Sequence, residues 1–251
     1  MDSTVRVTEV PASRGMRWMG EAFALFRQKP LGWIALCCGW LAITFSLIIV
    51  PLVGGVIANF LQPVFFASFA IAAYKQSAGE PISMADLFSG FRRNFRALVN
   101  LGALLLLAEI AIFALMAWMG MPIAGEGDQS FTVQEYVEAL RGKEWILATG
   151  FVMTVIVKGA LWFAPPLIAF HQMSVSHAMR WSVYAALSNL GAMIVYGTCL
   201  LGLFFLGAIP WLLGMLVVVP MMVISTYIGY RDVFESRSNT LGSDPNSSEL
   251  P

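Results

Sequence analysis

Two ionisable side chains, Glu109 and Lys158, lie inside long apolar runs of the sequence. Glu109 stands in LGALLLLAEIAIFALMAWMG (101–120), and Lys158 stands in FVMTVIVKGALWF (151–163). An unpaired charge at the centre of a bilayer costs about 3 kcal/mol or more. One acid and one base in successive apolar runs therefore suggest an ion pair, and intramembrane ion pairs also occur in proton relays and anion sites.

The two charges are predicted to lie at the same depth. Glu109 is eleven residues from position 120, and Lys158 is thirteen residues from position 145, where its own run begins. If both runs are helices and are antiparallel, a rise of 1.5 Å per residue places the two charges within about 3 Å of each other in depth. We expect them to pair, either as a structural staple that fixes the register of one hairpin or as a functional element. The staple is favoured, because the sequence shows no series of acids for a relay and no broken, polar span.

The composition indicates a membrane protein. Of the 251 residues, 58% are hydrophobic and 12% are charged, whereas about 25% are charged in soluble domains. The formal net charge of zero gives no basic excess that would favour nucleic acid as a partner. An all-α, polytopic fold with six transmembrane helices is predicted, because runs long enough to span hydrocarbon lie at 31–50, 56–74, 97–120, 145–170, 189–209 and 211–230.

Lysine and arginine residues predict the orientation of these spans. Twelve of them lie before the first span, after the last or in the connections on that same side, whereas the other side has only Arg141 and Lys143. Since cytoplasmic loops are enriched in these residues, both termini are expected to face the cytoplasm. The segment 122–144 is then an extracytoplasmic loop, and Thr132 with Glu135 resembles a capping box that begins a short helix there.

Similar strings recur along the chain. MRW occurs twice, and ALVNLGA at 97–103 is echoed by ALSNLGA at 186–192. Three tandem units are therefore expected, each an amphipathic segment followed by a helical hairpin. The predicted organisation is a flexible cytoplasmic tail (1–12), one transmembrane domain (13–235) with repeats at about 14–76, 82–172 and 174–232, and a disordered cytoplasmic tail (236–251).

The amphipathic segments are predicted to lie in the headgroup plane. In the first of them Met16, Met19, Phe23 and Phe26 share one helical face. We expect a lipid-facing collar that favours anionic lipid, and the alternative is a docking surface for a cytosolic partner. The candidate interfacial anchors are Arg17, Trp18, Arg92, Arg93, Arg180 and Trp181.

No string in the sequence predicts catalysis, a cofactor or a metal site. G-x-S-x-G, H-E-x-x-H, CxxC and P-loop motifs are absent. His171 and His177 are interpreted as solvated interfacial residues, and the three cysteines, Cys37, Cys38 and Cys199, as small hydrophobic residues within apolar runs.

Three stretches carry a resemblance to a known family. They are VPASRGMRWMGEAFALFRQKPLGWIAL, IIVPLVGGVIANFLQPVFFASFAIA and GEPISMADLFSGFRRNF, and in this order they resemble an uncharacterised family of proteobacterial inner-membrane proteins. The resemblance implies the cytoplasmic membrane of a bacterium and supplies no activity and no site residues. The leading hypothesis is a non-enzymatic accessory or organising protein that binds lipid, and its possible partners are another membrane protein or further copies of itself in a homo-oligomer. The alternative is a small-solute, ion or proton transporter that uses Glu109 and Lys158.

Overall fold

The computed structural model describes residues 6–51, 53–122, 133–209 and 211–235, and every regular element in these ranges is a helix. The predicted all-helical class is confirmed. The elements are α1 (Arg14–Gln28), α2 (Pro30–Ile48), α3 (Gly54–Ser77), the 3-10 helix η1 (Met84–Arg92), α4 (Phe95–Trp118), α5 (Val133–Leu140), α6 (Glu144–Ala160), α7 (Ala164–His171), α8 (Val175–Ser188), α9 (Leu190–Ala208) and α10 (Met215–Phe234).

Six segments of the described chain are long and apolar enough to cross a membrane, as predicted. They are α2, α3, α4, α6 together with α7, α9 and α10. The loop between α4 and α6 contains α5, which is the short helix expected there. Thr132 of the predicted capping box lies outside the described residues, as does the predicted tail at 236–251.

The fourth span is two helices rather than the single helix predicted. Proline has no N–H and clashes with the preceding turn, so the pair Pro165-Pro166 ends the regular hydrogen bonding of α6 and stands in the first turn of α7. The Ser182 hydroxyl of α8 supplies a partner for two backbone groups at the break. It accepts from the Phe163 amide at 3.0 Å and donates to the Ala160 carbonyl at 2.8 Å. The break is therefore stabilised by a neighbouring helix, as apolar surroundings require.

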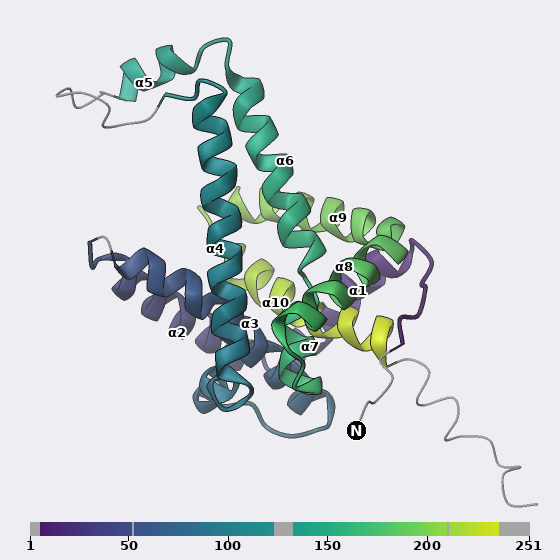
Figure 1. Cartoon of the computed structure of the whole chain (residues 1–251). Coiled ribbons are helices and arrows are strands. Elements are labelled where there is room, and N and C mark those ends of the chain that lie inside the picture. Colours follow the sequence, from purple (N-terminus) through teal and green to yellow (C-terminus); the bar gives the residue numbers. More distant parts are fainter. Residues whose placement is uncertain (1–5, 52, 123–132, 210, 236–251) are drawn as a thin grey trace, which may run out of the picture.

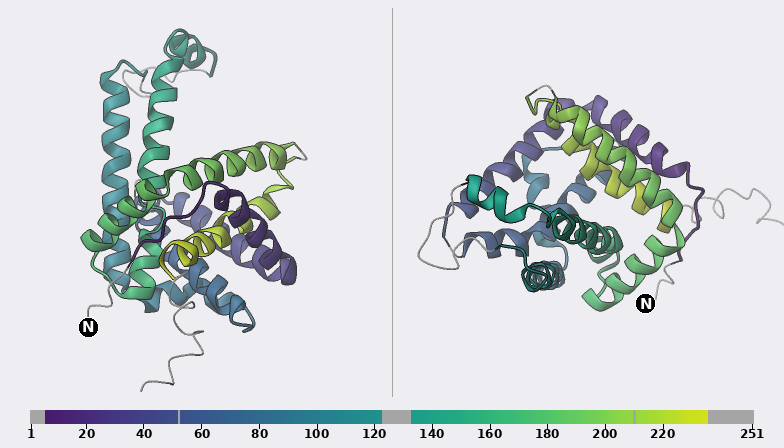
Figure 2. Two further views of the ribbon diagram at one scale, coloured as in Figure 1. Left: turned by 90° about the vertical axis from the view of Figure 1, so that its right-hand side faces the viewer. Right: turned by 90° about the horizontal axis from the view of Figure 1, so that it is seen from above.

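Three helical hairpins diverge from a common base. The α4–α6 hairpin rises above the rest of the molecule, whereas α2–α3 and α9–α10 leave the base in other directions (Figures 1 and 2). Both ends of the described chain lie at the base, because the Thr8 amide donates to the Val233 carbonyl at 2.8 Å. An even number of spans is consistent with ends that share one side.

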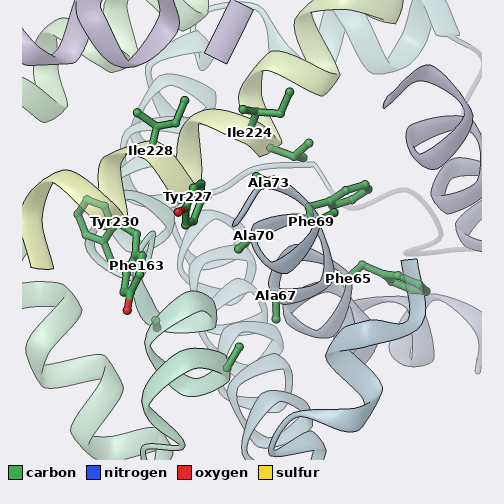
Figure 3. Close-up of a cluster of buried hydrophobic side chains, with 14 of the residues drawn as sticks. Phe65, Ala67, Phe69, Ala70, Ala73, Phe163, Ile224, Tyr227, Ile228 and Tyr230 are labelled. Atoms are coloured by element: carbon green, nitrogen blue, oxygen red, sulfur yellow. The ribbon is translucent and has the colours of Figure 1, made fainter. Parts of the chain in front are cut away.

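The core lies where α3, α7 and α10 converge at this base (Figure 3). Small side chains let α3 approach its neighbours closely, and the buried aromatic rings of Tyr227 and Tyr230 in α10 and of Phe163, which precedes α7, pack beside it. Half of the most apolar window of α3 and two thirds of that of α10 are buried, whereas the corresponding fraction is at most 22% in α2, α4, α6 with α7, and α9. The labelled core residues are Phe65, Ala67, Phe69, Ala70, Ala73, Phe163, Ile224, Tyr227, Ile228 and Tyr230.

The short helices η1 and α8 pack mainly on the hairpin that precedes them along the chain, whereas α1 packs on the last hairpin. η1 packs on α3 and α2, α8 packs on α7 and α6, and α1, which has no preceding hairpin, packs on α10 and α9. The first helix of the chain therefore packs against its last hairpin, α9–α10. The equivalence of the three sequence units stays a prediction.

Candidate intramembrane binding cleft

The α4–α6 hairpin brings Glu109 and Lys158 together. Lys158 Nζ donates to Glu109 Oε1 at 2.5 Å, and the two side chains are 37% and 33% exposed. Higher in the hairpin, Gly150 of α6 faces the Met116 side chain, and a Cβ at this position would overlap it. The helices therefore pack closely above the charges, and the pair stands at the level where the two residues were expected to meet. Its role as staple or functional element stays a prediction.

A glycine of α4 brings the α2–α3 hairpin against this pair. A Cβ added at Gly102 would lie 2.5 Å from the Phe60 carbonyl oxygen of α3. Small residues permit such close approach between membrane helices. Glu109 follows Gly102 by seven residues, about two turns, so the two residues lie on the same side of α4. Close packing at Gly102 consequently turns Glu109 toward the α2–α3 hairpin.

Between the two hairpins lies a cleft of about 290 Å³ that contains the ion pair. Its volume is roughly ten times the approximately 30 Å³ that a water molecule occupies in the liquid. Trp40, Ile48 and Ala58 supply apolar surface. The polar side chains that line it are Thr44, Asn59, Gln62, Glu109 and Lys158.

Much of the hydrogen-bonding capacity of the cleft is unused. The Asn59 amide donates to the Gly55 carbonyl at 3.0 Å, within its own helix. Among the described residues, the Gln62 carboxamide and the Thr44 hydroxyl have no hydrogen-bond partner, although neither side chain is fully exposed. Polar groups in apolar surroundings are stabilised when a partner is present. These three side chains can therefore bind a polar ligand without breaking an interhelical contact.

Comparison with known proteins agrees with the membrane location. Over 98% of its length the chain is 26% identical to a protein of Burkholderia thailandensis that is named a probable inner membrane protein, and the match covers 98% of that protein. The chain is a multi-pass inner-membrane protein. The expected resemblance to proteobacterial inner-membrane proteins of unknown function is confirmed. No family model and no solved structure matches this membrane protein.

Trp18 does not fit its expected role as an interfacial anchor. It is only 2% exposed, and its indole N–H donates to Asp232 Oδ2 at 2.9 Å. The Arg14 guanidinium binds both oxygens of the same carboxylate, at 2.6 and 2.7 Å, and this hydrogen bonding raises the Arg14 pKa above its ordinary value. The buried face of α1 is formed by Gly15, Trp18, Met19, Ala22 and Phe26.

Only part of the α1 face that was expected to meet lipid is therefore exposed. Met16 and Phe23 are exposed, whereas Met19 and Phe26 of the same predicted face are buried against protein. The predicted stripe was wrong in this respect, because a small residue, Gly15, lets α1 pack directly on the backbone of α9.

The other candidate anchors lie at or near the surface. Trp181 is half-buried and contacts Tyr184 edge to face, with ring centroids 6.0 Å apart. Whether these residues meet lipid stays a prediction. The exposed anchors are Arg17, Arg92, Arg93 and Arg180.

Sequence reasoning missed the second wall of the cleft. Thr44, Asn59 and Gln62 line one cavity with the ion pair, from helices that continue without a break. One signal was present in the sequence: Asn59 and Gln62 are three residues apart within an apolar run and so share a helical face. Nothing in the sequence indicated that this face meets Glu109.

The described residues contain no group of three metal-ligating side chains, and the three cysteines there are free thiols. His177 is exposed as expected. His171 differs from the expectation, because it is half-buried and its Nε2 is 2.7 Å from the Tyr230 hydroxyl.

Proposed function

We propose that this inner-membrane protein is a non-enzymatic accessory protein that binds a lipid in the cleft between the α2–α3 and α4–α6 hairpins. The observation that carries the proposal is the polar lining contributed by two separate hairpins. A staple for α4 and α6 requires only Glu109 and Lys158. It gives no reason for Asn59 and Gln62 to face the same space from α3.

The surroundings of the cleft favour a lipid over a water-soluble ligand. Large apolar side chains are exposed on the helices that form it, including Phe45, Ile110, Val155 and Ile156. In a bilayer, such surfaces contact acyl chains. A ligand with a polar group and attached hydrocarbon can place the polar group in the cleft and its chains along these helices.

Exposed arginines at the short helices support a second contact with lipid. We propose that Arg17, Arg92, Arg93 and Arg180 bind anionic headgroups at the cytoplasmic surface, as basic interfacial segments do. In this orientation both termini face the cytoplasm.

The test measures lipids retained by the purified full-length protein with native mass spectrometry. Gln62→Leu and Asn59→Leu remove cleft polarity and leave the ion pair intact, so the proposal expects fewer retained lipid molecules per chain. Thr198→Val is the matched control, because Thr198 is an exposed polar residue of α9 that does not line the cleft. Identical lipid retention in all four proteins would contradict the proposal.

Transport is the second candidate function, and the mid-span position of Glu109 and Lys158 favours it, since intramembrane charges often mark solute or proton pathways. A transporter would mediate flux in sealed proteoliposomes. Proton or solute flux that Glu109→Gln abolishes, in a variant that still folds, would replace lipid binding as the better proposal.

A further inference from the structure

Within the proposed lipid-binding function, and dependent on it, we infer that the ligand carries a zwitterionic headgroup with a primary ammonium and a phosphate. Glu109 and Lys158 can neutralise the two charges of such a headgroup, and the polar side chains that line the cleft can form hydrogen bonds with it.

Charge balance excludes ligands that carry a net charge. The ionisable side chains among the residues that line the cleft are one carboxylate, Glu109, and one ammonium, Lys158. An anionic or cationic headgroup would leave one uncompensated charge in apolar surroundings, where such a charge is costly. A zwitterion inserted beside the pair balances both charges at once, with its cation on Glu109 and its anion on Lys158.

The hydrogen-bonding groups match the same ligand. Glu109 uses Oε1 for Lys158, and among the described residues its Oε2 has no partner, so it can accept a hydrogen bond from an ammonium. Lys158 has three N–H donors and uses one for Glu109. The remaining donors, together with the Gln62 amide and the Thr44 hydroxyl, can bind phosphate oxygens. A trimethylated ammonium has no N–H to donate, so a primary ammonium fits better than a choline group.

The size and access of the cleft also fit a headgroup. About 290 Å³ accommodates a headgroup comparable in volume to about ten water molecules. The ion pair is about one third exposed, so it is accessible from the cleft rather than sealed between helices. The same chemistry could come from a free soluble zwitterion, and the apolar helix surfaces around the opening favour the lipid.

The experiment uses the delipidated full-length protein in detergent and native mass spectrometry. Phosphatidylethanolamine, phosphatidylglycerol and phosphatidylcholine with identical acyl chains are added separately, and free glycerophosphoethanolamine serves as the soluble counterpart. We expect phosphatidylethanolamine to bind about tenfold more tightly than either other lipid, the change produced by losing one hydrogen bond to a charged group. Gln62→Leu should reduce this binding about tenfold, whereas Thr198→Val should not. Equal thermal unfolding of the variants and the parent protein shows that folding is not the cause.

The contradicting results are distinct. Equal binding of all three lipids, with a similar loss for each in Gln62→Leu, overturns the headgroup inference and leaves the lipid-binding proposal intact. Lipid binding that Gln62→Leu does not change overturns both. Binding of glycerophosphoethanolamine as tight as that of the intact lipid overturns the lipid as the source of the zwitterion.

Discussion

Removal of the charges at positions 109 and 158, singly and together, tests whether they stabilise each other. Glu109→Gln leaves an ammonium in the last turn of α6, about halfway along the fourth span, and Lys158→Met leaves a carboxylate in the middle of α4. An unpaired charge at the centre of a membrane helix costs about 2.5–3.5 kcal/mol. Because each side chain is about one third exposed and lines the cleft, we expect each single substitution to reduce the free energy of unfolding by about 2–3 kcal/mol.

The double variant should be more stable than either single variant. With both charges removed no unpaired ion remains, and we expect a loss of only about 1 kcal/mol for the missing hydrogen bond. The double-mutant cycle then gives a coupling energy of about 3 kcal/mol or more. The free energy of unfolding is measured in mixed micelles with increasing dodecyl sulfate, followed by tryptophan fluorescence, and Thr198→Val serves as the control. If the loss in the double variant equals the sum of the two single losses, the pair does not stabilise the hairpin and the reasoning fails.

Four further predictions concern packing and orientation. Gly102→Val should lower the free energy of unfolding by about 3 kcal/mol or more, and with it the folded yield, because the valine side chain overlaps the Phe60 carbonyl. Gly197→Val is the control, because its side chain enters open space and should change the folded yield little. Equal yields of the two variants would contradict the close contact at Gly102. Asp232→Asn should lower the free energy of unfolding by about 1.5–3 kcal/mol, because the hydrogen bonds that Asp232 accepts from Arg14 and Trp18 are weaker without the negative charge. An unchanged unfolding temperature would contradict a stabilising role of these hydrogen bonds. Lipids with brominated acyl chains should quench the fluorescence of Trp118, which is 84% exposed, but not that of Trp18, which is 2% exposed. Trp118→Phe should therefore reduce the amplitude of the quenching, whereas Trp18→Phe should leave it unchanged. The opposite result would place α1 in lipid. Green fluorescent protein fused to the carboxyl end should fluoresce, and an active alkaline phosphatase fusion there would reverse the proposed orientation.

Periodicity and composition were sufficient for the spans and for the depth of the ion pair. A helix rises by a constant amount per residue, so counting from the outer end of each span places Glu109 and Lys158 at one level without any knowledge of packing. The break in the fourth span was only partly predictable. The sequence contains the proline pair that causes it, but the hydroxyl that supplies a partner for two backbone groups there comes from Ser182 in another helix.

The face of α1 illustrates where such reasoning ends. An amphipathic pattern distinguishes apolar from polar positions, but it cannot say whether an apolar face meets lipid or protein, because both surroundings exclude water. Trp18 is separated from its partner Asp232 by 214 residues. Only the docking of α1 on the last hairpin decides that this tryptophan is buried.

For this protein the sequence by itself determined the membrane location, the six helical spans and the matched depth of two opposite charges, because each follows from local hydropathy and a fixed helical rise. The tertiary structure alone decided that Asn59, Gln62 and Thr44 stand in the same cleft as those charges. The rotation of one hairpin against another depends on close packing at a few small residues such as Gly102, and no local pattern in the chain encodes it.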